Sequence, residues 1–422
     1  MTKRNFFPTI FMILFVCGMV FHQPLSAQLV LGQYEEEAPF GTWNINGIPT
    51  AAGTAMGNSF YTYAHDASSA LKNPALLSEL SSFAMTMNFS LNTASFYKYG
   101  LVNTGVIRFD EANAMGLYAV DFAGLAMRLG SWSAGVSYGN LEYFDRPAIK
   151  AEATYQGTTY YTLDYDQSGG LKNLNITLAR KIFEGLSAGV GINYIFGNYS
   201  RNQTDNWLTD GITITDKKEM DLNGFYINGG LYADISTKLA AGAVVRFPYI
   251  RKAESRSFVE YVSTTTNTTI TLDNHAKSKF KQPLLAGLGL LYRISSNVSL
   301  MSDISWINWE KYSVDYFEEE KARNFKNIIK GGIGAEYRGE ISLFKKRFVM
   351  PIRFGIDIDP QPMRDPDSAY TNFCFGLGVH KNRFKVDLGA SYGKESGSGD
   401  KLKAGKIVLT ISYSAEERKT RR

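Results

Sequence analysis

Alternation of large apolar residues with small or polar ones recurs along most of this 422-residue chain. The stretch GLSAGVGINYIFG places Leu186, Val190 and Ile192 on one side of an extended chain, and Ser187 and Asn193 on the other. Because successive side chains of a β-strand point to opposite faces, a two-residue period predicts strands with one apolar face. In order, the pattern predicts fourteen strands at about 82–93, 116–129, 131–142, 172–183, 186–199, 219–235, 237–253, 278–294, 297–312, 326–339, 347–359, 369–382, 383–395 and 402–414.

The connections between these strands fall into two classes. Very short turns are expected at 129–131, 183–185, 235–237 and 295–297, and long polar loops at 94–115, 143–171, 200–218, 254–277 and 313–325. An even number of strands with short turns on one side and long loops on the other is typical of bacterial outer-membrane barrels. The sequence therefore predicts an all-β fold: a 14-stranded antiparallel transmembrane β-barrel over 82–414, in the outer membrane of a Gram-negative cell, with both termini periplasmic.

A secreted soluble sandwich or propeller is the alternative fold. Soluble sheets also alternate, but their outward faces usually carry Lys, Glu and Thr. Here one face is repeatedly aliphatic, with aromatic residues near strand ends such as Tyr194, Phe196 and Tyr292. No later stretch is long and apolar enough for a transmembrane helix. The barrel therefore remains the preferred fold.

The two ends of the chain lie outside this pattern. Lys3 and Arg4 precede an apolar run at 11–21 and an A-x-A-like site at 25–27, which predicts a signal peptide over 1–27. Cys17 follows a valine rather than the small residue of a lipobox, so a lipoprotein signal is rejected. The mature chain keeps only Cys374, hence no intramolecular disulfide, and ends in a charged tail over 415–422.

The residues that could carry enzyme chemistry are sparse. The mature chain has three histidines to serve as a base, at positions 65, 275 and 380, and it has no G-x-S-x-G elbow. His380 is expected to be a polar strand-end residue, and Trp306 and Trp309 to be anchors at the membrane interface. We expect no catalytic site, no metal site and no cofactor. A net charge of only +5, spread along the chain, predicts no nucleic-acid partner.

Residues 28–81 do not alternate and precede the first strand. Their last part, HDASSALKNPALLSEL, predicts a helix from an N-cap at Asp66 to Leu71, interrupted at Asn73 and Pro74. A barrel of about fourteen strands has a lumen, which would be an open aqueous channel if nothing filled it. We therefore expect 28–81 to form a hatch, or plug, inside the lumen.

The stretch AAGTAMGNSFYTYAHDASSALKNPALLSEL resembles the hatch of the FadL/TodX family of outer-membrane transporters of long-chain fatty acids and other hydrophobic compounds. That pattern has a small, Gly-rich run, then Asp-Ala-Ser, then Asn-Pro-Ala before the first strand. The matching residues are Gly53, Gly57, Asp66, Ala67, Ser68, Asn73, Pro74 and Ala75. Later, KQPLLAGLGLLYRISSNVSLMSDISWINWEKY resembles the family's Pro-then-strand hairpin that closes on a Trp, and NFCFGLGVHKNRFKVDLGASYG resembles its late strands. The chain departs from the pattern at Leu76, where the family has Gly, and at its non-aromatic C-terminus.

The resemblance implies passive uptake through a plugged barrel, with lateral release through an opening at a kinked early strand. Its gate motif corresponds to Asp66, Asn73, Pro74 and Ala75. The Asn73 amide would pair with backbone groups at a broken ladder, although an ordinary helix stop before proline explains it as well.

Two further residue sets follow from this comparison. Gly135 and Gly139, on the third predicted strand, permit a bulge or bend, although glycine is common in any barrel strand. Leu71, Leu76 and Leu77 are expected either to line the ligand site or to pack the hatch against the wall.

The implied partners are a long-chain fatty acid or other hydrophobic small molecule, together with outer-membrane lipid and lipopolysaccharide. An alternative from another class is a FadL-like accessory barrel of a Bacteroidota-type protein secretion system. In that alternative the Tyr/Thr-rich loops at 143–171 and 254–277 would bind protein rather than pass lipid. A general pore or an adhesin is a third possibility.

Overall fold

The structure is a computed structural model that describes most of the chain beyond its N-terminal part. The described residues are 50–63, 66–80, 82–95, 107–108, 113–144, 146–316, 319–322, 325–343, 346–364, 367–397 and 403–415. The predicted signal peptide, residues 28–49 of the predicted hatch, His65 and the charged tail from residue 416 lie outside them.

In the described part of the chain, three short helices precede the strands: α2 (Ala51–Ala55), α3 (Ser69–Lys72) and the 3₁₀-helix η1 (Pro74–Glu79). The strands that follow are β1 (Phe83–Ser95), β2 (Ile107–Arg108), β3 (Asn113–Leu129), β4 (Trp132–Tyr143), β5 (Arg146–Tyr155), β6 (Thr158–Phe183), β7 (Leu186–Trp207), β8 (Ile212–Asp234), β9 (Leu239–Arg246), β10 (Tyr249–Ser263), β11 (Thr268–Gln282), β12 (Leu285–Arg293), β13 (Val298–Ile307), β14 (Ser313–Tyr316), β15 (Glu319–Ala322), β16 (Ile328–Leu343), β17 (Lys346–Pro360), β18 (Ala369–Lys381), β19 (Phe384–Ser396) and β20 (Lys403–Ala415). A second 3₁₀-helix, η2 (Trp309–Lys311), separates β13 from β14.

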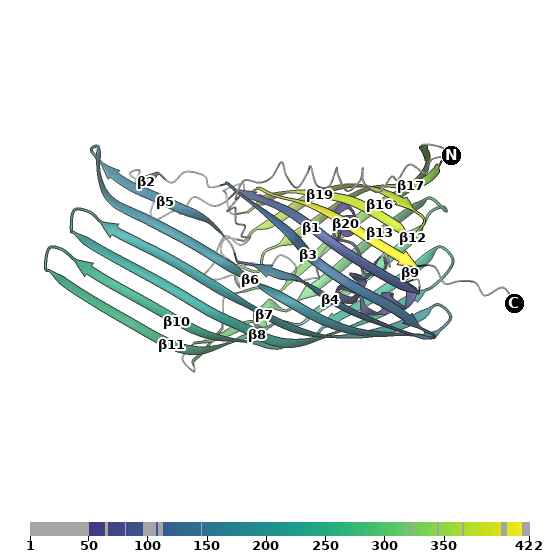
Figure 1. The fold of residues 1–422 in the computed structure, drawn as a ribbon, viewed down its shortest axis with the longest axis horizontal. Coiled ribbons are helices and arrows are strands. Elements are labelled where there is room, and N and C mark those ends of the chain that lie inside the picture. Colours follow the sequence, from purple (N-terminus) through teal and green to yellow (C-terminus); the bar gives the residue numbers. More distant parts are fainter. Residues whose placement is uncertain are drawn as a thin grey trace, which may run out of the picture.

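These strands form a closed antiparallel barrel (Figure 1). Each strand pairs with its neighbour along the chain, and β1 pairs with β20 from Phe83 opposite Ala415 onward, which closes the sheet. Six wall strands are interrupted, so β2 and β3, β4 and β5, β9 and β10, β11 and β12, β13 and β14, and β15 and β16 each make up one strand. The wall therefore contains fourteen strands, and the predicted fold class is confirmed.

The short turns lie where the sequence predicts them, for example between Leu129 and Trp132 and between Phe183 and Leu186. The prediction of long loops at 143–171, 200–218 and 254–277 is wrong, because strands occupy most of these residues. Six strands, β5 to β8, β10 and β11, run far beyond the rest of the rim as a projecting sheet, on the left of Figure 1. The prediction failed because both faces of this sheet are largely polar, so its alternation is weak.

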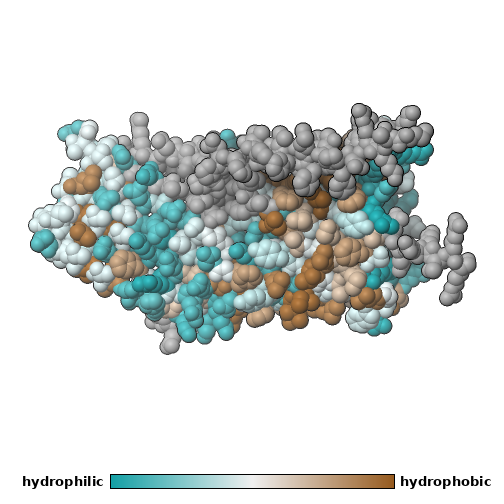
Figure 2. Space-filling view, in the orientation of Figure 1, coloured by the Kyte–Doolittle hydropathy of each residue, from teal (hydrophilic) through white to brown (hydrophobic). Residues whose placement is uncertain are grey.

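Large apolar side chains cover the outside of the barrel near the tight-turn end (Figure 2). Leu174, Ile176 and Leu178 on β6 are each more than 40% exposed, while their neighbours Asn173, Asn175 and Thr177 are buried toward the lumen. The projecting sheet is mostly hydrophilic in the same view. An apolar outside with a polar inside is the arrangement of a sheet that faces lipid. Among the described residues, no helix has the length and apolarity needed to cross a membrane.

Candidate functional site

The hatch segment, residues 50–80, lies inside the barrel against glycines of the wall. A Cβ added at Gly189 of β7 would lie 2.5 Å from the Pro74 carbonyl carbon, and one at Gly389 of β19 would lie 2.1 Å from the Ala51 oxygen. The same close approach to hatch backbone recurs at Gly242, Gly332 and Gly355. Because real Cβ contacts are never so short, only glycine at these positions lets the hatch backbone approach the wall. The inward-facing glycines of the wall therefore form the surface on which the hatch packs. We call this surface the seat.

Asn73 joins the hatch to this seat. Its Nδ2 donates to the Tyr61 oxygen at 2.7 Å within the hatch and to the Leu231 oxygen of β8 at 3.0 Å. Its Oδ1 accepts from the Ala75 nitrogen at 3.1 Å, which caps η1 at Pro74. The Asn73 side chain is fully buried, so each of these bonds replaces water. Leu231 pairs with both β7 and β9, so the Asn73 amide contacts a continuous ladder rather than a broken one.

The remaining gate residue, Asp66, forms a turn rather than a helix N-cap. Its Oδ1 accepts from the Ser68 nitrogen at 2.8 Å, and α3 begins only at Ser69. The predicted helix from Asp66 is therefore shorter than expected. Nearby, Lys72 is buried with its Nζ 4.5 Å from the Phe60 ring, and burial lowers the pKa of this lysine to about 8.

A wall carboxylate, Asp303 of β13, fixes the first part of the hatch. Its Oδ2 accepts hydrogen bonds from the Phe60 and Tyr61 nitrogens, at 2.5 and 2.8 Å. The Tyr61 hydroxyl lies 2.8 Å from the Ser305 hydroxyl, one inward-facing position further along the same strand. A buried carboxylate that accepts from two backbone N–H groups is a strong anchor.

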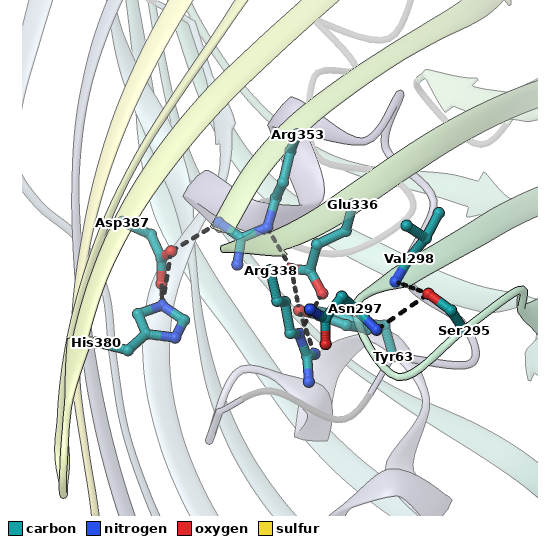
Figure 3. Close-up of polar contacts among 9 residues, drawn as sticks. All are labelled: Tyr63, Ser295, Asn297, Val298, Glu336, Arg338, Arg353, His380 and Asp387. Carbon is teal, nitrogen blue, oxygen red and sulfur yellow. Dashed lines mark hydrogen bonds and ion pairs between the residues drawn. The ribbon is translucent and has the colours of Figure 1, made fainter. Parts of the chain in front are cut away.

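A buried ionic network holds the first part of the hatch at its end, Tyr63 (Figure 3). The Tyr63 hydroxyl donates to Glu336 of β16 at 2.6 Å, and Arg353 of β17 bridges Glu336 and Asp387 of β19. His380 of β18 lies 2.9 Å from Asp387. His380 is thus a member of a structural network near its strand end, and its neighbours tie Tyr63 to three wall strands.

The three leucines of the hatch face different surroundings. Leu76 packs with Met56, Tyr232 and other buried residues of the seat, and Leu77 packs among small alanines and against Gly135 of β4. Leu71 packs against Phe122 of β3. Their role in lining a ligand site stays a prediction, and Leu71 occupies the most informative position because Phe122 marks a discontinuity in the wall.

That discontinuity is a gap between β3 and β4. Their ladder ends at Phe122 opposite Gly139, although both strands extend beyond this pair along the wall. Beyond this point β3 pairs only with β1, and β4 only with β6, among the described strands. Two links bridge the start of the gap: the Tyr143 hydroxyl donates to Asp121, and Asn140 Nδ2 donates to the Val120 oxygen at 3.3 Å.

Bulges flank the gap on both strands. The β1–β3 register shifts between Asn88 and Ser90, and the β4–β6 register shifts between Asn140 and Glu142, where Leu141 has no partner. Such bulges redirect a strand and end its pairing. Gly139 lies at the end of the ladder and Gly135 makes room for Leu77, and the kink role of both stays a prediction.

Sequence reasoning missed a second glycine pair opposite the bulge. Gly169 has a positive φ of 122°, and a Cβ on Gly170 would lie 2.8 Å from the Glu142 oxygen. The signal that could have found this site is a Gly-Gly pair inside a strand, which often marks a bulge or a close approach.

Above the hatch, the lumen contains a cluster of buried aromatic and aliphatic side chains. Trp309 is 1% exposed within it, so its predicted role as an interface anchor is wrong, whereas Trp306 is exposed on the outer face. The members are Phe60, Tyr61, Leu141, Phe144, Leu171, Ile195, Tyr199, Met220, Leu222, Tyr226, Val244, Tyr249, Ala253, Phe280, Leu285, Ile307, Trp309, Tyr312, Val314, Phe325, Ile328 and Met363.

Two arginines and one carboxylate lie within this lumenal cluster. The Arg251 guanidinium lies 5.0 Å from the Phe280 ring and donates to Glu142 of β4 at 3.0 Å. Arg246 lies about 6 Å from the rings of Tyr226 and Tyr249. Apolar walls with a few fixed charges suit an amphipathic ligand.

Comparison with known proteins places this geometry in a family. A family model described as BamG matches residues 13–403, nearly the whole chain. The chain belongs to the BamG family. No curated protein matches this BamG-family chain.

Solved structures share the fold. The toluene transporter TodX of P. putida has a TM-score of 0.64 at 14% identity, covering 88% of this chain and 100% of its own. The Ralstonia pickettii toluene transporter TbuX scores 0.63 at 12% identity, covering 88% and 99%. A Pseudomonas aeruginosa FadL homologue scores 0.62 at 12% identity, covering 87% and 99%. At these identities the similarity supports a FadL-like outer-membrane barrel fold.

Proposed function

We propose that this BamG-family barrel takes up long-chain fatty acids or similar hydrophobic compounds across the outer membrane by passive diffusion. The observation that carries the proposal is the gap between β3 and β4, because it lies beside the hatch residue Leu71 and opens from an apolar lumen. Burial of apolar surface stabilises such a ligand by about 25 cal/mol per Å². TodX and TbuX are described as toluene transporters, which supports a hydrophobic substrate class for this fold.

In this proposal the hatch controls access to the gap. Asp66, Asn73, Pro74 and Ala75 keep the hatch in its seat, and Leu71 presents its side chain to Phe122 where the β3–β4 ladder ends. A ligand would pass from the lumenal cluster to this edge and leave sideways into lipid. The tight-turn end, with both termini, would face the periplasm.

Asn73→Ala tests the proposal. It removes the two bonds that Nδ2 donates and the cap of η1, so we expect a barrel that assembles but takes up labelled palmitate several-fold more slowly. Asn206→Ala is the matched control, because Asn206 lies on the projecting part of β7 and away from the hatch. Equal palmitate uptake by Asn73→Ala and wild type, at equal surface amounts of folded protein, would refute the hatch role.

A second candidate function is supported by one edge of the projecting sheet. β11 pairs with β10 along its whole length but with β14 only at Lys279–Lys281, so its other edge is unpaired over Thr268–Ser278 within the described chain. Its uncharged TTITL stretch exposes Ile270 and Leu272 by more than half. Open edges of this kind accept a strand from another protein. An accessory barrel of a Bacteroidota-type protein secretion system would use it.

The two candidates separate in one double variant. Ile270→Lys with Leu272→Lys adds charges to the open edge without touching the lumen. For the secretion function we expect loss of protein secretion from the cell with palmitate uptake unchanged. Normal secretion in cells carrying this variant would argue against a strand-adding partner.

A further inference from the structure

The pair of Glu142 and Arg251 joins β4 to β10 inside the cluster of aromatic side chains. The Arg251 side chain is 0% exposed, the Glu142 side chain is 4% exposed, and their bond measures 3.0 Å. Arg251 lies on β10, whereas Glu142 lies on β4, so the two residues are separated by 109 positions in the chain. A buried ion pair costs free energy to form, and breaking it leaves a buried charge without compensation. Which carboxylate pairs with Arg251 therefore has a large effect on free energy.

Glu142 belongs to the edge of the wall gap. It follows the bulged residue Leu141 and stands three residues beyond Gly139, where the β3–β4 ladder ends. The next residue, Tyr143, links the same edge to Asp121 of β3. The backbone of β4 at this point pairs with β6, Glu142 opposite Leu171, and not with β3, and the Glu142 side chain adds a bond to Arg251 of β10.

Arg251 is suited to bind the carboxylate of a ligand in place of that of Glu142. A guanidinium offers planar, forked donors that match a carboxylate, and its bonds to a charged acceptor are stronger than neutral ones. Around Arg251 the lumen is lined by apolar and aromatic groups such as Phe280 and Leu222, which would cover an alkyl chain. A long-chain fatty acid carries both parts of this complement in one molecule.

We infer that the carboxylate of a long-chain fatty acid replaces that of Glu142 on Arg251, and that the released segment of β4 then widens the gap toward β3. This inference rests on the proposed uptake function and adds a device that couples ligand binding to lateral release. The exchange leaves no guanidinium unpaired, since one carboxylate takes the place of another. Glu142 moves with its strand, and the widened gap gives its carboxylate access to water.

The test compares palmitate with methyl palmitate, which lacks the charge, on the purified full-length barrel. Glu142→Gln removes the competing carboxylate, so we expect palmitate to bind about tenfold more tightly and methyl palmitate to bind as before. Arg251→Gln should weaken palmitate binding about tenfold or more, with methyl palmitate again unaffected. The double variant Glu142→Gln with Arg251→Gln leaves no unpaired buried charge and should show equal affinity for both probes, even if the single Arg251 variant folds poorly.

The conformational part is read from spin labels on either side of the gap. Labels at Val120 on β3 and Lys172 on β6, introduced in a Cys374→Ala background, occupy exposed positions on the outer surface. We expect the distance between these labels to lengthen on adding palmitate to wild type, and to be long without ligand in Glu142→Gln. Asp216→Asn is the matched control, because it breaks a partly buried arginine pair on the projecting sheet, away from the hatch and the gap, and should leave the distance unchanged.

The outcomes distinguish the inference from the function on which it rests. No binding of palmitate by wild type would overturn both the proposed uptake and the ligand exchange. Palmitate binding that responds to Glu142→Gln and Arg251→Gln in the same way as methyl palmitate binding would overturn the exchange alone. An unchanged label distance in Glu142→Gln would overturn the coupling to the gap.

Discussion

The wall of this barrel is built in two different ways around the hatch segment. Beneath the hatch, on β7 to β9 and β16 to β19, the ladders continue and inward-facing glycines bring two backbones into contact. Beside it, on β3 and β4, the ladder stops, bulges occur on both strands, and side chains such as Tyr143 and Asn140 make the links. Backbone contact through glycine tolerates little movement, whereas side-chain links can be exchanged. The difference predicts a rigid seat and a deformable exit.

Filling the seat should have the largest effect. Gly189→Val would place atoms on the Pro74–Ala75 backbone, which cannot shift without moving the hatch as a whole. We expect a folded barrel with a displaced hatch, measured as a several-fold higher conductance in planar bilayers. Gly331→Ala is the control, because the atom nearest its Cβ is 3.7 Å away. A wild-type conductance for Gly189→Val would contradict a rigid seat.

Removing the anchor of the hatch should have an intermediate effect. Asp303→Ala leaves the Phe60 and Tyr61 N–H groups without their acceptor, at a cost of about 2–3 kcal/mol in hatch docking. Limited proteolysis should then cut the hatch faster while the barrel stays resistant to heat in detergent. Asp216→Ala, on the projecting part of β8, controls for loss of a carboxylate, and equal cleavage rates in both variants would speak against the anchor.

Loosening the exit should have the smallest effect on stability. Tyr143→Phe removes the hydroxyl that donates to Asp121 and keeps the ring in its place. We expect the thermal unfolding of the barrel to change little and palmitate uptake to rise about twofold, because the gap has lost one of its links. Tyr165→Phe removes a buried hydroxyl that donates to Gln167 and serves as control. Reduced uptake in Tyr143→Phe alone would mean that this link supports transport instead.

The sequence was sufficient to predict the strands that have one apolar outward face and one small or polar inward face. Strands such as β18 and β19 alternate between exposed apolar residues and small or polar inward residues, so their positions were predicted to within a few residues. The projecting strands failed because their two faces are both polar, so 254–277 was predicted as a loop although it covers parts of β10 and β11.

The candidate site was predictable only where it is local in sequence. The order of Asp66, Asn73 and Pro74 located the hatch contacts, and Gly139 lies at the end of the β3–β4 ladder. The pairing of Glu142 with Arg251 was out of reach, because it depends on the register of strands more than one hundred residues apart. The inward glycines were visible as a pattern, but their partner, the hatch backbone, was not.

The length of the projecting strands has a consequence for what can reach this protein from outside. β7 has 22 residues, about twice the roughly 9–11 that a tilted strand needs to cross a bilayer. At about 3.3 Å per residue the excess amounts to roughly 35 Å of strand, or about 25 Å of height at a 45° tilt. In the proposed orientation, with the tight turns in the periplasm, antibodies or phage tail proteins would meet the tip of the sheet before any other described part of the barrel.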